Sequence, residues 1–226
     1  MQVISEQSIK FYYMYMHHPD EDQIKITRLI TYLEQYHSLT KGLISAYREN
    51  CKVIYVKKNK YILSPVDANK YLYYIVDGVA RGFVRDQGQE ITTWFAFEHE
   101  IIGAIRNPAE DSSYSSEYLQ ALENCLLVCI PYQLVNNIYE EYPETNTIAR
   151  KLLEIQYFTA SKRSILARIP KALDRYKQLL AENQTGMSKI PLRYIASYLS
   201  MRLETLSRIR KKEFSSTIIP QIQEVA

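Results

Sequence analysis

The chain has 226 residues, a formal net charge of +3 and a mean hydropathy of −0.28. This length is enough for one large domain or two small ones, each with a buried core. The N-terminus lacks a basic segment followed by an apolar one, and no apolar run reaches the roughly 18 residues of a membrane span. These features predict a cytoplasmic protein without a signal peptide.

The charge is unevenly distributed along the chain. Residues 150–212 contain 15 Lys and Arg against 4 Asp and Glu, whereas the remaining residues contain 13 against 21. This asymmetry indicates that the C-terminal part binds a polyanion. A solvated basic face is the alternative interpretation.

The cysteines do not indicate a disulfide framework or a metal site. Cys51, Cys125 and Cys129 are odd in number and form no C-x-x-C pair. We expect three reduced and mostly buried thiols. Cys125 and Cys129 are four residues apart in a predicted strand, which separates them by about 13 Å, too far to share a metal ion.

Two helices are predicted near the N-terminus. Residues 20–36 have an amphipathic pattern with acidic residues at the start, and Thr40 is a suitable cap for a second helix that ends near Arg48. The apolar residues expected to face inward in the first helix are Ile24, Leu29, Ile30 and Leu33.

Residues 51–130 have the pattern of short β-strands. Seven or eight segments rich in β-branched and aromatic residues are separated by turn signals, of which Asp77-Gly78 is the clearest and "DQGQ" is a second. This spacing predicts a β-barrel or jelly roll.

Helical periodicity returns at Pro131, and a long helix is predicted from Pro143 to Ile169. Its apolar seam can pack on the barrel or on the same helix of a second copy. We favour the dimer, because a seam of roughly 40 Å overhangs a small barrel. The seam positions are Ile148, Leu152, Ile155, Thr159, Lys162, Leu166 and Ile169. A further helix is expected from Pro170 to Leu180, followed by the loop "ENQTGMSKI".

The stretch "IPLRYIASYLSMRLETLSRIRKKEF" has the pattern of a helix-turn-helix. Two helical patterns are broken at Ser200-Met201, and Ala196 supplies the small residue where the second helix crosses the first. The apolar positions expected to join the two helices are Ile195, Leu199, Met201, Leu206 and Ile209.

The second helix of this motif presents a polar face suited to DNA. Glu204 and Arg208 are four residues apart and share this face, with Ser207 and Lys211 beside them. Arginine can bond two acceptors on a guanine edge, and glutamate can accept from a cytosine amine. The cations suited to phosphate contacts are Arg193, Arg202, Arg210 and Lys212. A plain amphipathic helix pair with a charged exterior is the alternative.

The segment "YIASYLSMRLETLSRIRK" resembles the DNA-binding motif of the Crp–Fnr superfamily of transcription regulators, most specifically at "ETLSR". The loop "YIVDGVARGFV" resembles the glycine turn of the family's β-roll around Gly78. The resemblance implies an α+β fold with an N-terminal β jelly-roll, cyclic nucleotide-binding-like sensor domain at residues 1–142. It also implies a dimerisation helix at 143–169 and a winged helix-turn-helix at 170–226. Such a homodimer binds double-stranded DNA, and RNA polymerase is a further partner.

Three positions depart from the family's DNA-binding pattern. Ser200 stands where many members have glycine in the tight turn, and Arg202 stands where many have a capping Ser or Thr. Leu203 stands where the cyclic-AMP receptor has a base-reading arginine. We therefore expect a different target sequence.

The sensor departs further from relatives that bind cyclic AMP. The segments "GAI" and "YSSEY" match the family's ribose-binding and phosphate-binding elements, but the carboxylate and the guanidinium of those elements are absent. A buried phosphate without its cation is costly. Cyclic AMP is therefore not expected, and the effector is a different small molecule or none. The candidate effector-pocket residues are Gly103, Ile105, Arg106, Ser115 and Ser116.

No cofactor or metal is expected. The N-terminal cysteine cluster of the family's oxygen sensors is missing, which argues against an iron–sulfur cluster. His17 and His18 adjoin Pro19 near the N-terminus, and we assign them no haem or metal role.

Enzyme motifs are also missing from the sequence. It has no phosphate-binding glycine loop, no H-E-x-x-H and no nucleophile elbow, and Glu98-His99-Glu100 has the pattern of a polar turn. We expect a non-enzymatic, sequence-specific transcription regulator. A degenerate cyclic nucleotide-binding-like module that acts through protein partners is the alternative.

Overall fold

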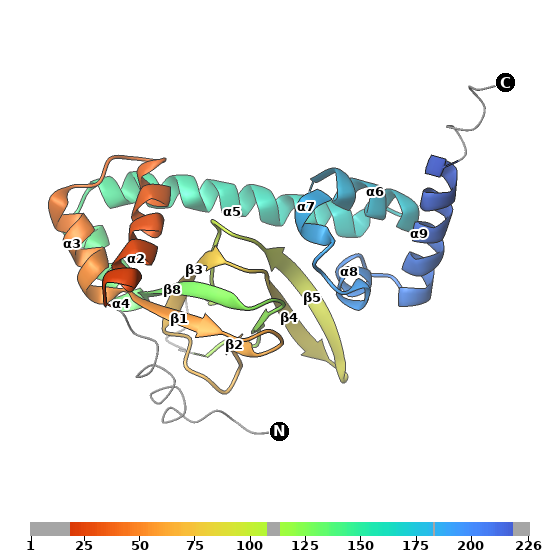
Figure 1. Cartoon of the computed structure of the whole chain (residues 1–226), viewed down its shortest axis with the longest axis horizontal. Coiled ribbons are helices and arrows are strands. Elements are labelled where there is room, and N and C mark those ends of the chain that lie inside the picture. The colour runs from red at the N-terminus through yellow and green to blue at the C-terminus, as the bar shows by residue number, and fades with distance from the viewer. Residues whose placement is uncertain (1–18, 108–113, 183, 219–226) are drawn as a thin grey trace. The chain divides into compact units, whose positions relative to one another are not determined.

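The computed structural model describes residues 19–107, 114–182 and 184–218, and the chain forms two compact units (Figure 1). Unit 1 comprises the described residues up to Ala80 and those from Ala96 to Glu154. Unit 2 comprises residues 81–95 and the described residues from Ile155 onward. The division into three domains expected from the sequence stays a prediction.

Unit 1 begins with two helices, α2 (Pro19–Glu34) and α3 (Lys41–Asn50), which confirms both N-terminal helices predicted above. The predicted cap is also present, because the Thr40 hydroxyl accepts a hydrogen bond from the Leu43 N–H at 3.4 Å. Helices α2 and α3 contact the sheet that contains β8, as does α4 (Tyr132–Glu141).

The strands of unit 1 form antiparallel ladders. β2 (Tyr61–Leu63) pairs with β7 (Tyr118–Ala121). The other ladder has the order β1-β8-β3-β6, in which each pair is antiparallel. Its members are β1 (Lys52–Val56), β8 (Cys125–Pro131), β3 (Tyr71–Asp77) and β6 (Ile101–Ile102). The sequence did not predict β6, because two residues are too few to show an alternating pattern.

Gly78 forms the predicted turn after β3. Its φ is 106°, and a Cβ at this position would lie 2.6 Å from the carbonyl oxygen of Asn124. Both the backbone conformation and the close approach therefore require glycine here.

The core of unit 1 lies between α2, α3 and the first sheet. Ile26, Leu29, Ile30 and Leu33 are buried at the spacing of one helix face. Ile24 is 61% exposed, so the prediction that it faces inward is wrong. It lies two residues before Ile26, about 200° away around the helix.

All three cysteines are buried and free, which confirms that they are reduced thiols. Burial raises the pKa of Cys51 and of Cys129 to about 12, and burial raises that of Cys125 to about 11. The protonated thiol is therefore the stable form of each near neutral pH.

Unit 2 combines a hairpin with the C-terminal helices. The hairpin is formed by β4 (Ala80–Asp86), from Arg81 onward, and β5 (Gln89–Ala96). Gln87 and Gly88 between them both have positive φ, which confirms the predicted "DQGQ" turn. The helices are α5 (Glu144–Arg168), which runs through both units, α6 (Ala172–Glu182), α7 (Gln184–Met187), α8 (Leu192–Tyr198) and α9 (Leu203–Ile218).

Two details of the C-terminal part differ from the expectation. The single-turn helix α7 lies inside the predicted loop "ENQTGMSKI". The described residues after Pro170 form no strand, and α9 continues through Ile218, where the described part of the chain ends. The predicted wing is therefore not confirmed, and residues 219–226 lie outside the described part of the chain.

None of the helices in the described residues combines the length and apolarity that a bilayer crossing needs.

Candidate functional site

A Schellman motif ends α8 and makes the tight turn that a helix-turn-helix requires. The Met201 N–H bonds to the Ala196 carbonyl at 3.0 Å, and the Ser200 N–H bonds to the Ser197 carbonyl at 3.0 Å. Ser200 lies in the left-handed region with a φ of 51°. The turn therefore forms here with a serine in the position that glycine usually fills.

Replacing Ser200 with glycine is expected to stabilise the protein. The left-handed conformation costs a non-glycine residue about 1–2 kcal/mol, which glycine avoids. Glycine loses more conformational entropy on folding, and this offsets about 0.5–1 kcal/mol of that gain. We expect Ser200→Gly to raise the unfolding temperature by about 1–4 °C in a thermal melt. Ser161→Gly, in the middle of α5, is the control and should lower it. A melt in which Ser200→Gly is less stable than wild type would contradict the expected relief of strain.

The two helices of the motif pack as the sequence predicts. Ile195, Ala196, Leu199 and Leu206 are buried, and Met201 and Ile209 are partly buried. The contact between α8 and α9 is therefore apolar.

The predicted recognition face of α9 is exposed. Glu204, Ser207, Arg208 and Lys211 are all exposed and lie at helical spacing. Leu203 is 41% exposed and lies on the surface beside this face. The geometry thus leaves a continuous polar face with both a guanidinium and a carboxylate.

The cations predicted to contact phosphate are not equally placed. Arg202 and Lys212 are exposed, whereas Arg210 is partly buried. Arg193 is exposed, but its guanidinium lies 4.6 Å from the ring centroid of Tyr194 and donates to the Tyr194 hydroxyl at 2.7 Å. Arg193 is therefore held by the residue that follows it.

Arg175, on α6, supports the turn and was not predicted. Its Nε donates to the Leu199 carbonyl at 2.8 Å, and its Nη1 donates to the Ile169 carbonyl at 2.6 Å. One side chain thus satisfies a carbonyl group just after the end of α8 and another just after the end of α5. No sequence signal separates this arginine from its basic neighbours.

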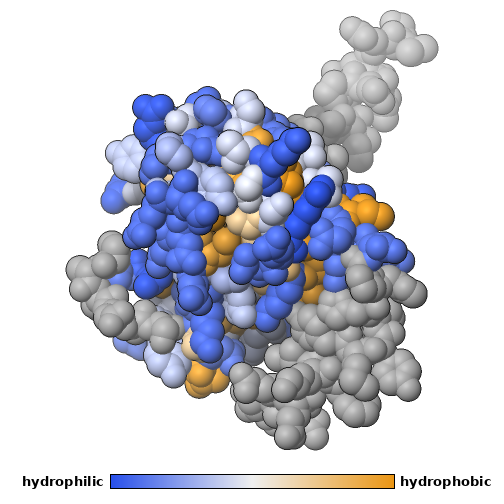
Figure 2. All heavy atoms as spheres, turned by 90° about the vertical axis from the view of Figure 1, so that its left-hand side faces the viewer, coloured by the Kyte–Doolittle hydropathy of each residue, from blue (hydrophilic) through white to orange (hydrophobic). Residues whose placement is uncertain are grey.

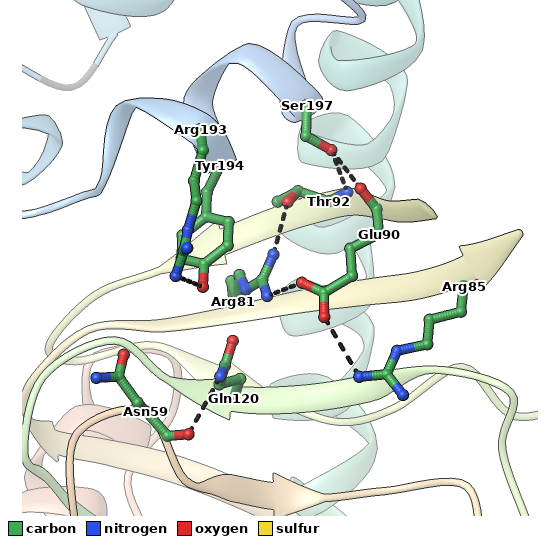
Figure 3. A network of polar contacts seen from close by, with 9 residues as sticks. All are labelled: Asn59, Arg81, Arg85, Glu90, Thr92, Gln120, Arg193, Tyr194 and Ser197. Atoms are coloured by element: carbon green, nitrogen blue, oxygen red, sulfur yellow. Dashed lines mark hydrogen bonds and ion pairs between the residues drawn. The ribbon is translucent and has the colours of Figure 1, made fainter. Parts of the chain in front are cut away.

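Arg81, on β4, is a second residue that the sequence did not single out. Its side chain is only 1% exposed and lies between two rings, 3.5 Å from the centroid of Tyr194 and 4.1 Å from that of Phe83 (Figure 3). It forms an ion pair with Glu90 and donates to the Thr92 hydroxyl at 3.2 Å.

The ion pair holds both groups in their charged forms. Burial lowers the pKa of Arg81, although the hydrogen bond that Arg81 donates to Glu90 opposes the shift. Burial also tends to raise the pKa of Glu90, but the hydrogen bond and charge of Arg81 outweigh it, so the pKa lies below its usual range.

The predicted effector residues lie on two segments of unit 1. Gly103, Ile105 and Arg106 follow β6, and Ser115 and Ser116 precede β7, whereas residues 108–113 lie outside the described part of the chain. Arg106 lies over the ring of Tyr132, 5.0 Å from its centroid. Gly103 is tightly packed, because a Cβ there would lie 2.6 Å from the Leu72 side chain.

A buried carboxylate joins these two segments. Glu117 is fully buried, and its Oε2 accepts a hydrogen bond from the Ile105 N–H at 3.0 Å. Its own N–H donates to the Ser115 hydroxyl at 3.1 Å. The sequence showed Glu117 within "YSSEY" but gave no sign that its charge points inward among the candidate effector residues.

A separate pocket lies in unit 1 beside α2. It has a volume of about 460 Å³ and is lined by residues of α2 together with Tyr74 and His99. The Tyr74 hydroxyl lies 2.9 Å from His99 Nδ1. None of the candidate effector residues lines this pocket.

His99 lies in the polar turn that the sequence predicted between β5 and β6. No group of three potential metal ligands occurs among the described residues. His17 and His18 lie outside the described residues.

This chain was compared with protein families, with curated proteins and with solved structures. Residues 53–142 match the family model of the cyclic nucleotide-binding domain. No curated protein matches the chain.

Among solved structures, FixK2 from Bradyrhizobium japonicum is 18% identical with a TM-score of 0.63, and the match covers 74% of this chain and 86% of FixK2. A Crp/Fnr-family transcriptional regulator from Eubacterium rectale is 17% identical with a TM-score of 0.65, and the match covers 82% and 88% of the two chains. The c-di-GMP-responsive global regulator CLP from Xanthomonas campestris is 14% identical with a TM-score of 0.64, and the match covers 79% and 94%. The chain therefore has the fold seen in the Crp–Fnr transcription regulators, and its residues 53–142 match the cyclic nucleotide-binding domain family.

Proposed function

We propose that the chain is a homodimeric, sequence-specific DNA-binding transcription regulator of the Crp–Fnr type. The observation that carries this proposal is the exposed face of α9, on which Glu204, Ser207, Arg208 and Lys211 follow a tight helix-turn-helix turn. Residues 150–212 supply the positive charge that attracts a DNA backbone. Binding, and not catalysis, is the function that this surface supports.

The proposal is tested by direct binding. Purified protein is titrated onto a labelled pool of random 40-base-pair duplexes, with and without a large excess of unlabelled poly(dI-dC), at several salt concentrations. A fraction of the pool that stays bound against the competitor supports sequence-specific recognition. If the competitor displaces all of the labelled DNA, the binding is electrostatic and not sequence-specific, which would contradict the proposal.

The dimer is supported by a stretch of α5 whose side chains are exposed among the described residues. All eight residues from 153 to 160 are exposed. They include Leu153 at 67%, Tyr157 at 77% and Phe158 at 62% exposure, and Ile165 further along is 60% exposed. An uncovered helix with this many large apolar side chains is typical of an interface. The described residues on the face over α2 and α3 are mainly hydrophilic, with apolar areas between them (Figure 2).

Part of the seam predicted from the sequence packs within the chain itself, whereas its Ile155 is 43% exposed. Ile148 is buried in the core of unit 1, Leu152 packs against that core, and Leu166 is buried as well. Phe158 and Ile165, the exposed pair seven residues apart, each precede a predicted seam position by one residue. The proposed interface is therefore rotated by about 100° around the helix.

The proposed effector is a molecule other than cyclic AMP, or none. Glu117 places a buried carboxylate beside Ser115 and Ile105, where the family's phosphate-binding element matches this chain. A carboxyl group supplies a phosphate with no cation, so Glu117 does not replace the missing guanidinium. Arg106 is engaged with the Tyr132 ring.

Cyclic AMP is accordingly expected not to bind. Isothermal titration calorimetry with cyclic AMP, at concentrations well above the micromolar range, should show only heat of dilution. Cyclic di-GMP, titrated in the same way, should give the same result, because it also carries phosphate charge. A micromolar affinity for either nucleotide would show that another group of the chain takes the place of the missing guanidinium.

A further inference from the structure

The hairpin of β4 and β5 belongs to unit 2 with the helix-turn-helix, although the chain on both sides of it belongs to unit 1. The chain leaves unit 1 after Ala80 and returns to it at Ala96, so the hairpin is joined covalently to unit 1 at both ends. Within unit 2 the same hairpin contacts α8 through polar side chains (Figure 3).

Ser197 of α8 binds the backbone of β5 on both sides of Ile91. Its hydroxyl donates to the Glu90 carbonyl at 2.8 Å and accepts from the Thr92 N–H at 3.0 Å. β5 lies at the end of its sheet order, so these backbone groups belong to an edge strand. Ser197 therefore takes the place of a neighbouring strand at this point of the edge.

Arg81 makes the second connection, through Tyr194 of α8. The buried guanidinium is stacked 3.5 Å from the Tyr194 ring and is fixed on its other sides by Phe83, Glu90 and Thr92. Separating a buried charge from such partners strongly destabilises the folded protein. Arg81 thus cannot shift without its partners, and it restricts the orientation of the Tyr194 ring.

The position of Tyr194 in turn affects a residue of the proposed DNA surface. The Arg193 guanidinium lies over the Tyr194 ring and donates to its hydroxyl. In a helix-turn-helix the first helix crosses the phosphate backbone while the second enters the groove. The direction in which Arg193 projects, and the angle at which α9 enters, therefore depend on how α8 is held.

We propose that Arg81 is a positioning residue for DNA binding, which holds α8 through Tyr194 so that Arg193 and the recognition face of α9 meet the duplex together. This inference rests on the proposed function.

The test compares two arginines of the same hairpin. Arg81→Met removes the cation but keeps an unbranched side chain of similar length. Arg85→Met makes the same charge change at a 39% exposed residue that pairs with the same Glu90 carboxylate. The probe is a labelled 30-base-pair duplex that carries the palindrome selected by the wild-type protein, with a scrambled duplex beside it.

Arg81→Met is expected to weaken operator binding by about tenfold or more, and to weaken binding to the scrambled duplex by a smaller factor. Arg85→Met should change operator binding by less than about threefold. Unchanged operator binding in folded Arg81→Met would overturn the inference. Tighter operator binding by Arg81→Met would also overturn it, because Arg81 would then hold α8 and α9 in an arrangement that disfavours DNA binding. If Arg81→Met does not fold, Ser197→Ala, which removes both bonds to β5, should weaken operator binding in the same selective way.

Hydrogen exchange separates this inference from the proposed function, because it needs no DNA. The amides of α8 should exchange faster in Arg81→Met than in wild type and Arg85→Met, while those of β8 keep their protection. If wild type selects no DNA but α8 loosens in this way, the proposed function fails and the positioning of α8 stands. Equal α8 exchange in all three proteins would show that Arg81 does not hold the helix.

Discussion

Phe158→Glu is expected to convert the proposed dimer into monomers. Burying a phenylalanine side chain stabilises an interface by about 1.5–3 kcal/mol, and a two-fold axis counts each substitution twice. Losing both copies would cost about 3–6 kcal/mol, which weakens the dimer by about two to four orders of magnitude even before the repulsion of the new charges. Sedimentation velocity at micromolar protein concentration should show the shift.

Ala167→Glu provides the matched control on the same helix. Ala167 is exposed and lies nine residues after Phe158, on the opposite side of α5. Its replacement should leave the sedimentation coefficient at the wild-type value. A Phe158→Glu protein that still sediments as a dimer, with an unaltered circular dichroism spectrum, would place the interface elsewhere.

Arg208→Ala is expected to have the second large effect. A bidentate contact to a base pair contributes about 1–3 kcal/mol of discrimination, and a symmetric operator contains the contact twice. The affinity for the operator should therefore fall by between about 30-fold and about 10⁴-fold, and the preference at one base pair of each half-site should flatten. Fluorescence anisotropy with operators altered one base pair at a time measures both effects.

Lys211→Ala distinguishes a base contact from a phosphate contact. Lys211 is exposed on the same helix, and we expect it to contact phosphate. Its loss should weaken binding to all duplexes similarly and reduce the salt slope by about one unit per contact. A uniform loss with Arg208→Ala, indistinguishable from that of Lys211→Ala, would contradict the assignment of Arg208 as a base reader.

The sequence predicted most of the local structure, because local structure depends on neighbours in the chain. Thr40 caps α3, Gly78 and Gly88 have positive φ, and the apolar positions of the helix-turn-helix are buried or partly buried, all as their patterns indicate. Each of these features is determined by residue type within a few positions.

The features that the sequence did not reveal depend on contacts between distant residues. Arg81 and Ser197 are far apart in the chain, and only the folded structure brings the hairpin to α8. Glu117 is buried because of its place next to Ile105, not because of any pattern around it. Ile148 and Leu152 of α5 satisfy a heptad pattern while packing in their own chain's core. An apolar periodicity shows which residues are buried, but not which partner buries them.

The most direct test of the proposed function is the selection of binding sites from random duplexes, carried out in parallel with wild type and Arg208→Ala. Wild type should enrich a palindrome whose half-sites are centred about one helical turn, roughly 10 base pairs, apart, as two copies of α9 on a two-fold axis require. Arg208→Ala should enrich a weaker palindrome that has lost its preference at one position in each half-site. If wild type enriches no palindrome, or if both proteins enrich the same one equally strongly, the α9 face is not the surface that reads DNA.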